Sequence, residues 1–301
     1  CVRAVVGFRP DMVVSVGGGS AIDEAKAVIY IYNKIMSAQN PRHAKPVFAV
    51  VPTTSGTGSE VTKATVITDG DKKVIMFDED FLPDIAILDV EFAKSMPMSL
   101  LAETAIDTLT HAFETLVSRF ASDFSDAVAE KSAKLVFRNL EDIFSGRDSV
   151  MARTHLHNAA CLAGIGFTNA SLGINHSMAH ALGAIFHIPH GRANAILLTK
   201  TLEFNAKSPE VEKKLSGLCE ELGLDLAKHA NRCSSALIEK INSLLELCKM
   251  PKGMRDVGVT PEAYGANVPE LAKRAMEDAC TPGNPVAPTY EDLINLFVKS
   301  Y

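Results

Sequence analysis

Two segments of the chain carry side chains that could bind a metal ion. Asp107 and His111 stand four residues apart, so on a helix both face the same way. An isolated pair of this kind is more often a surface pair, or a core histidine with a polar partner. The second segment holds four of the nine histidines in one short stretch, namely His176, His180, His187 and His190. Together the two segments offer one divalent ion a carboxylate and several imidazoles.

The histidine-rich segment is the more informative of the two. His176 and His180 repeat the spacing of four residues and lead into an otherwise apolar helix, predicted over residues 178–186. Imidazoles are costly to bury without partners, so core packing explains this density of histidines poorly. Pro189 ends that helix, which lets His190 reach back to the same site from a loop. We therefore predict a metal site here.

The first of two glycine-rich loops follows an apolar run at residues 12–16 and precedes a helical pattern at residues 20–32. Glycines allow a pyrophosphate to approach the backbone, and the amides that begin a helix favour its charge. The spacing is not G-x-G-x-x-G, so this is not the Rossmann fingerprint. Taken alone, the loop is equally well explained as a tight turn without a ligand.

A second loop of glycines and hydroxyls, residues 52–60, follows the next apolar run at residues 46–51. The two runs and the helix between them predict a βαβ unit with a parallel sheet. Ligands of such sheets bind at the carboxyl ends of the strands, where both loops lie. The pair of loops therefore favours nucleotide binding over two tight turns without a ligand.

The elements that position these residues fall into two halves. After the βαβ unit, further strands are expected at residues 66–68, 73–77 and 85–88. From Ser99, the predicted N-cap after Pro97, nearly all of the chain has helical spacing. The fold class is thus α/β: a parallel-sheet nucleotide-binding domain and an all-helical metal and catalytic domain. We place these domains at residues 1–98 and 99–301.

Composition excludes several kinds of partner. The chain has 301 residues, 47% hydrophobic and 22% charged, with a net charge of −6 and dispersed basic residues, which argues against nucleic acid and anionic membranes. No apolar run reaches the roughly 20 residues of a membrane span, and no signal segment is present, so a cytoplasmic protein is expected. Six widely spaced cysteines suggest neither a disulfide framework nor a thiolate zinc site.

Four motifs resemble those of the iron-containing (group III) alcohol dehydrogenases: VGGGSAIDEAK, VPTTSGTGSEVT, AIDTLTHAFE and GINHSMAHALGAIFHIPHGRANAILL. The resemblance covers nearly the whole chain from about Met12. It implies a divalent metal, Fe2+ with Zn2+ as the alternative, and a catalytic role for His180 beside the metal and near the nicotinamide. The ligands that it implies are Asp107, His111, His176 and His190.

The same resemblance implies the sites of a dinucleotide, NAD(H) or NADP(H), and of the substrate. Phe167 would line the substrate pocket, and His187 is expected to be only a neighbour of the metal site. The residues implied in cofactor binding are Gly18, Gly19, Ser20, Thr53, Thr54, Thr57 and Lys73.

One departure from the family pattern lies at the start of the chain. Family members carry a further N-terminal βαβ segment before the strand at Met12, so we expect the first domain to be incomplete. Residues 121–127 and 157–164 resemble the propanol and ethanol dehydrogenases of bacterial propanediol and ethanolamine utilisation, and bifunctional aldehyde/alcohol dehydrogenases are close as well. A homo-oligomer, a dimer or larger, and a location in the cytoplasm or inside a bacterial microcompartment are implied.

The predicted reaction interconverts a small primary alcohol and its aldehyde, with a metal as Lewis acid and hydride transfer to or from the nicotinamide. One alternative is a lyase resembling dehydroquinate synthase, which uses a metal and NAD on a polyanionic substrate. The predicted surroundings of the metal argue against it because they are apolar: Phe113, Phe167, Met178, Ala181 and Leu182. A second alternative is an inactive, truncated nucleotide-binding or assembly module.

Overall fold

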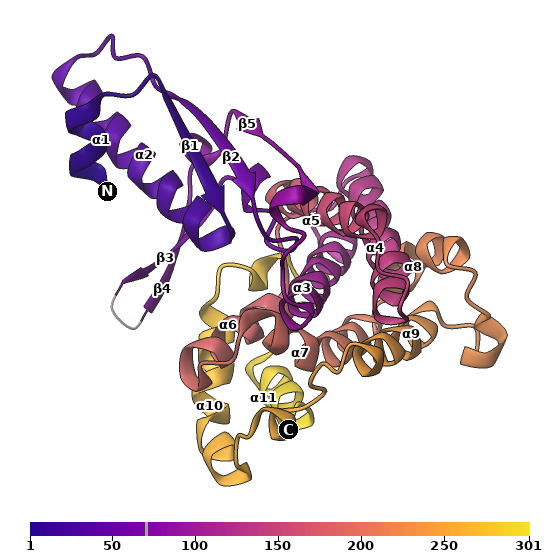
Figure 1. Ribbon diagram of the computed structural model, residues 1–301. Coiled ribbons are helices and arrows are strands. Elements are labelled where there is room, and N and C mark those ends of the chain that lie inside the picture. Colours follow the sequence, from indigo (N-terminus) through magenta and orange to yellow (C-terminus); the bar gives the residue numbers. More distant parts are fainter. Residues whose placement is uncertain (70–71) are drawn as a thin grey trace.

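The computed structural model describes residues 1–69 and 72–301 and separates an α/β part from a helical part (Figure 1). Three parallel strands form the main sheet in the order β1–β2–β5: β1 (Met12–Gly17), β2 (Val47–Pro52) and β5 (Ile85–Ala86). The helix α2 (Gly19–Gln39) connects β1 to β2 and packs against the short helix α1 (Val2–Phe8). The predicted βαβ unit is confirmed.

The α/β part has a small core of its own. Ile22 and Ile29 of α2 pack on Phe48 and Val50 of β2, all four almost fully buried. These residues place one face of α2 on the sheet, so its first turn lies beside the carboxyl ends of β1 and β2. The local packing therefore puts both glycine-rich loops at one edge of the sheet.

The middle strands, whose pairing the sequence left open, do not join the parallel sheet. β3 (Ala64–Asp69) and β4 (Lys72–Phe77) pair antiparallel and form a separate two-stranded sheet. The reason is the short connection between them, since parallel strands need a crossover of a dozen residues or more. The hairpin lies against α2 and is visible below it in Figure 1.

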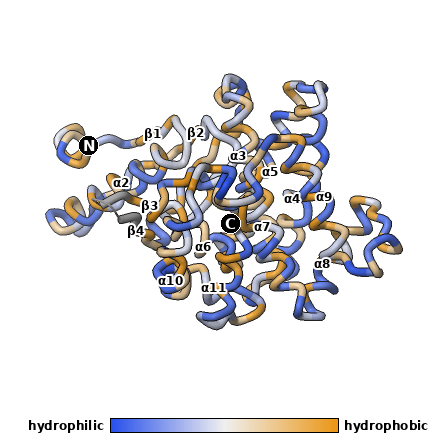
Figure 2. The backbone as a smooth tube through the Cα atoms, turned by 90° about the horizontal axis from the view of Figure 1, so that it is seen from below, coloured by the Kyte–Doolittle hydropathy of each residue, from blue (hydrophilic) through white to orange (hydrophobic). Residues whose placement is uncertain are grey.

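Helices make up the second part, and hydrophobic and hydrophilic stretches alternate along them, as expected for helices that bury one face (Figure 2). Within residues 1–69 and 72–301, no helix combines the length and the apolar character that a membrane span requires. The helices are α3 (Met98–Val117), α4 (Asp123–Phe144), α5 (Val150–Ala170), α6 (Ile174–Phe186), α7 (His190–Asn205), α8 (Pro209–Glu221), α9 (Cys233–Leu247), α10 (Pro261–Glu277) and α11 (Tyr290–Lys299).

Three local predictions in this part need correction. α3 begins at Met98, with Pro97 at the N-cap position and no side-chain cap, so Ser99 lies inside the first turn of the helix. The helix that carries His176 begins at Ile174, well before residue 178. His190 is not in a loop but is the first residue of α7, since His187 ends α6 in a left-handed turn with φ of 55° and Pro189 caps the next helix.

Candidate metal centre

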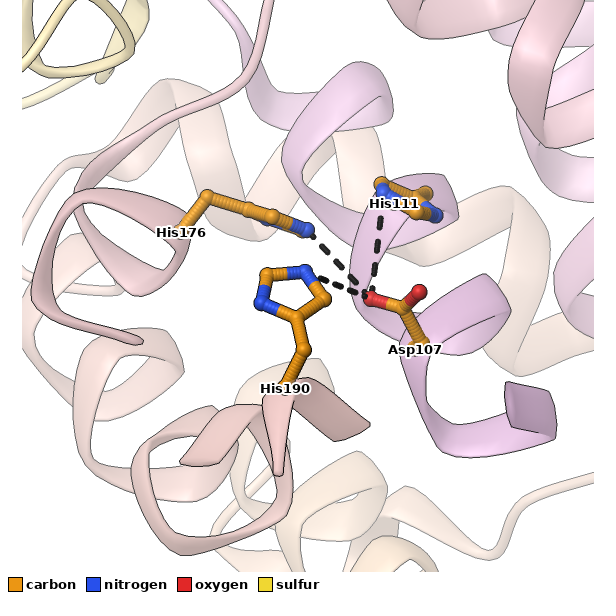
Figure 3. Close-up of side chains that lie close together, drawn as sticks. All are labelled: Asp107, His111, His176 and His190. Atoms are coloured by element: carbon orange, nitrogen blue, oxygen red, sulfur yellow. Dashed lines mark ion pairs between the residues drawn. The ribbon is translucent and has the colours of Figure 1, made fainter. Parts of the chain in front are cut away.

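Three helices bring the predicted ligands together. Asp107 and His111 come from the buried middle of α3, His176 from the first turns of α6, and His190 from the start of α7. All four point into one space (Figure 3). The Nε2 atoms of His111, His176 and His190 lie 3.8, 3.5 and 3.3 Å from Asp107 Oδ1. The four ligand atoms are within 4.8 Å of one another.

The donor set fits a divalent metal ion. In a tetrahedral site with bonds of about 2.1 Å, neighbouring ligand atoms are about 3.4 Å apart, close to the three distances from Asp107 Oδ1. One carboxylate and three imidazoles suit Fe2+, Zn2+, Co2+ or Ni2+. Asp107, His111 and His176 are buried, while the side chains of His190 and His180 are 34% and 24% exposed. The centre therefore opens on the side of these two histidines.

Glu114 orients one of these imidazoles and was missed by the sequence analysis. Its Oε2 lies 2.5 Å from His176 Nδ1, and its Oε1 accepts a hydrogen bond from the backbone amide of Asn175 at 2.6 Å. The carboxylate favours a proton on Nδ1, so Nε2 keeps its lone pair toward the centre. Only the fold could reveal this contact, because 62 positions separate the two residues.

Asn194 is a second polar neighbour that the sequence analysis missed. Its amide nitrogen donates to Asp107 Oδ1 at 2.7 Å, and its own oxygen accepts from Asn175 at 2.9 Å. Asn194 lies four residues after His190 on α7, so it faces the same side of the helix. A spacing of four from a candidate ligand is the signal that could have found it.

Burial and neighbouring charges set the protonation of the centre. Burial lowers the pKa of His111 to about 3, so its imidazole is neutral at neutral pH. For Asp107, burial opposes ionisation, but the facing imidazoles outweigh it and hold the pKa well below its usual range. His176 is also buried, yet Glu114 and Asp107 raise its pKa to about 9. Without a metal, His176 is therefore a cation at neutral pH, and an ion that binds Nε2 must displace the proton there while Nδ1 keeps the one against Glu114.

His180 lies beside the cluster but outside the set of four. Its ring stacks on that of His190 at 5.5 Å between centroids, and its Nδ1 lies 2.8 Å from Asp278 Oδ2. Burial disfavours the charge of Asp278, but the hydrogen bond from His180 outweighs it and lowers the pKa to about 2. An ionised Asp278 fixes the proton of His180 on Nδ1 and leaves Nε2 free. His187, by contrast, is exposed at the end of α6.

The predicted substrate residue contacts the centre, and the predicted cofactor residues lie in the α/β part. Phe167 of α5 stacks on His111 with ring centroids 4.6 Å apart. The two glycine-rich loops touch: a Cβ on Gly18 would lie 3.1 Å from Thr54, and one on Gly19 would lie 2.8 Å from Thr57. Ser20 follows in the first turn of α2, and Thr53 follows the end of β2. Lys73 belongs to β4, but its side chain lies outside the described part.

Comparison with known families agrees with this arrangement. Residues 1–90 match the family model described as iron-containing alcohol dehydrogenase. Residues 101–301 match the one described as the C-terminal part of the iron-containing alcohol dehydrogenase family. The chain belongs to the iron-containing alcohol dehydrogenase family. The predicted family is confirmed, and this membership favours a dehydrogenase over the lyase that was weighed against it.

Relatives of this alcohol dehydrogenase agree in sequence and fold. The chain is 43% identical to 1-propanol dehydrogenase of Salmonella typhimurium over 282 residues, which cover 92% of this chain and 74% of the relative. The iron-containing alcohol dehydrogenase of Thermococcus thioreducens matches with a TM-score of 0.88 and 33% identity, over all of this chain and 80% of that one.

A third protein was solved with a bound dinucleotide. Sulfoacetaldehyde reductase from Bifidobacterium kashiwanohense in complex with NAD+ matches with a TM-score of 0.85 and 27% identity, over all of this chain and 78% of that one. With the family established, the chain is an enzyme, an NAD(P)-dependent alcohol oxidoreductase that uses a divalent metal. The predicted fold class, a sheet domain followed by a helical domain, is confirmed as well.

Proposed function

We propose that Asp107, His111, His176 and His190 hold the divalent metal of this alcohol dehydrogenase, Fe2+ in the first place with Zn2+ as the alternative. The observation that carries the proposal is the convergence of three imidazole Nε2 atoms on one carboxylate oxygen, at 3.3 to 3.8 Å. Such a group of ligand atoms in a largely buried place supports the binding of a divalent cation. The Glu114 contact supports it, because ligand histidines usually donate their second nitrogen to a carboxylate.

The cofactor site that we propose lies at the carboxyl ends of β1 and β2. Gly18, Gly19 and Ser20 would bind the pyrophosphate of NAD(H) or NADP(H), supported by their place at the start of the 21-residue helix α2. Thr53, Thr54 and Thr57 would contact the nucleotide and nicotinamide, supported by the contact between the two loops. Lys73 is kept as a candidate for the ribose. Residues 1–98 and 99–301 are the proposed cofactor and metal domains.

When bound, the metal supplies Lewis-acid polarisation of the substrate oxygen, and the nicotinamide supplies or takes the hydride. His180 carries the proton in our proposal. Its Nδ1–H is held by Asp278, so Nε2 accepts the hydroxyl proton of an alcohol during oxidation and returns it during reduction. Its partly exposed side chain gives that proton a path to solvent.

The proposed substrate is a small primary alcohol or its aldehyde. Phe167 stacks on His111 and offers an apolar wall to a short alkyl chain. The 43% identity to an enzyme named for 1-propanol supports a substrate of about that size.

We further propose a homo-oligomer, a dimer or larger, in the cytoplasm or inside a bacterial microcompartment. The family resemblance of the sequence motifs is the ground for the oligomer, and the similarity to the propanol dehydrogenase is compatible with the location. Light scattering and cell fractionation test the two statements separately. A monomer at working concentration would contradict the first, and a membrane-bound fraction would contradict the second.

Elemental analysis combined with a cofactor assay tests the proposed function. We expect about one equivalent of divalent metal per chain, and one NADH or NADPH consumed for each short aldehyde reduced. Turnover without a stoichiometric change in the cofactor would contradict the oxidoreductase and favour a lyase. His180→Ala should keep the metal but slow turnover, whereas loss of the metal in this variant would make His180 a ligand.

A further inference from the structure

Residues 53–58, here named the cofactor loop, connect β2 to the 3-10 helix Ser59–Val61 and lie against α3 and α5. Two glycines make the contact. A Cβ added to Gly56 would fall 2.5 Å from the Cβ of Thr104, and one added to Gly58 would fall 2.7 Å from the Cα of Gly164. Gly58 also has a φ of 63°, which other residues rarely adopt. The backbone of the cofactor loop is thus in close van der Waals contact with α3 and α5.

Two side-chain contacts add to this close approach. The hydroxyl of Thr108 lies 3.3 Å from the carbonyl oxygen of Gly56 and 3.0 Å from that of Thr104. Thr108 is the neighbour of the proposed ligand Asp107 on α3. The metal-binding helix therefore contacts the cofactor loop directly, one residue from the centre.

The other contact joins Ser55 of the loop to His157 of α5. Ser55 Oγ and His157 Nδ1 are 2.9 Å apart, and both side chains are buried. Burial lowers the pKa of His157, so the pair is neutral at neutral pH. Within residues 1–69 and 72–301, no hydrogen-bond partner is present for the buried Nε2 of His157. An apolar pair would fill this space without leaving a polar atom unsatisfied, so packing alone does not account for a histidine here.

We propose that Ser55 and His157 are positioning residues for hydride transfer, because their hydrogen bond fixes the cofactor loop against α3 and α5. On its other side the loop contacts Gly18 and Gly19 through Thr54 and Thr57. The pair thereby sets the distance between the nicotinamide and the metal-held substrate, where a misplacement of about 1 Å costs on the order of 100-fold in rate. This inference rests on the proposed function of the two loops.

Ser55→Ala and His157→Ala test the inference, with Ser132→Ala as the matched control. Ser132 is a buried serine whose hydroxyl donates to the Ala159 carbonyl of α5 at 2.8 Å and not to a residue of the loop. We expect the two test variants to keep wild-type metal content and to lose about 10- to 100-fold in kcat. The primary isotope effect with deuterated alcohol should rise, since the hydride step becomes slower. Ser132→Ala should change neither quantity.

Amide hydrogen exchange of the metal-free, cofactor-free chain gives a readout independent of turnover. Residues 53–58 should exchange faster in Ser55→Ala and His157→Ala than in Ser132→Ala, because only the first two release the loop. Unchanged exchange together with an unchanged isotope effect would overturn the inference. If His157→Ala does not fold, Ser55→Ala decides the same question with a smaller change.

The double variant separates a shared hydrogen bond from two independent effects. If the pair acts through one bond, Ser55→Ala combined with His157→Ala should lower kcat no further than the larger single change. Fully additive losses would overturn the inference. His157→Asn, which can place an amide near the former Nδ1, should restore part of kcat. Failure of the proposed function is distinguishable, because wild-type enzyme would then lack metal or cofactor turnover.

Discussion

Two buried clusters in this enzyme, one around Lys26 (the Lys26 cluster) and one around Asp107, compensate the charge of a buried carboxylate in different ways. In the α/β part, Lys26 is fully buried and donates to both oxygens of Thr62 and to the carbonyl of Ala64, at 2.8 to 3.0 Å. The carboxylate of Asp23 lies 4.0 Å away, and Glu60 is close enough to interact. All three donors of the ammonium are used. This cluster therefore contains its own cation.

The cluster around Asp107 has no such lysine or arginine among its contacts in the described chain. Three imidazoles face the carboxylate, and Asn194 supplies one neutral donor. The ammonium group of a lysine is part of the chain, so the positive charge beside its carboxylates is always present. Aspartate and histidine side chains that surround a space can instead bind a metal ion of defined coordination. The Lys26 site is thus neutralised within the chain, whereas the Asp107 site has the ligand set of the proposed metal centre.

Removal of a proposed ligand should have the largest effect. Asp107→Ala or His176→Ala leaves three ligands, and we expect metal affinity and activity to fall together by more than about 100-fold. Elemental analysis after dialysis and the NADH assay measure both. His155→Ala, which removes an imidazole of α5 outside the cluster, is the control. Full activity with wild-type metal content in either ligand variant would refute the assignment.

Lys26→Met should instead destabilise the fold without affecting metal binding by the folded chain. It leaves the carboxylate of Asp23 and the carboxyl group of Glu60 without the ammonium beside them, and breaking a buried pair in this way typically costs about 3 to 5 kcal/mol. Urea denaturation measures the loss. Lys45→Met is the control, because the Lys45–Asp80 pair is exposed and should contribute less than about 1 kcal/mol. Equal effects of the two variants would remove the distinction between the clusters.

Glu114→Gln tests the support of the metal centre rather than a ligand. The neutral amide no longer favours a proton on His176 Nδ1, so we expect metal affinity to fall by about 10- to 100-fold while the fold persists. Competition with a chelator measures the change. An affinity equal to that of the wild type would show that the carboxylate does not orient this imidazole.

The pH dependence of stability should show the smallest effect, and it belongs to the Lys26 cluster. Burial raises the pKa of Glu60 from 4.5 to about 7, so the folded chain keeps a proton that the unfolded chain releases. Stability should therefore fall as the pH rises through this window, on the order of 1 kcal/mol per pH unit.

Glu60→Gln provides the comparison for this pH dependence. The variant should lack the loss of stability between about pH 5 and pH 7, because it has no proton to retain. Urea midpoints across the range measure it. The pKa of Lys26, lowered by burial to about 8, acts at higher pH and so does not mask the effect. Parallel curves for wild type and variant would contradict the prediction.

Local pattern was enough to predict the βαβ unit, the helical half and the ligand cluster. Two residues four positions apart face the same side of a helix wherever that helix lies in the fold. Asp107 could therefore be paired with His111 from the sequence alone. Turns decided the pairing of the middle strands, which was not predicted, and the start of α7, which was predicted wrongly. The link between β3 and β4 is too short for a crossover, and the left-handed turn at His187 lets α7 begin as early as His190.

Residue types and their spacing alone thus determined the proposed chemistry of this protein: a carboxylate and imidazoles as metal ligands, and glycine turns after strands as the dinucleotide site. Only the tertiary structure decided which distant groups support them. Glu114 reaches His176, Asp278 reaches His180, and Ser55 meets His157 across 62, 98 and 102 positions. Such contacts depend on how whole helices pack, and packing is set by the apolar surfaces buried between elements, which no local pattern around a polar residue records.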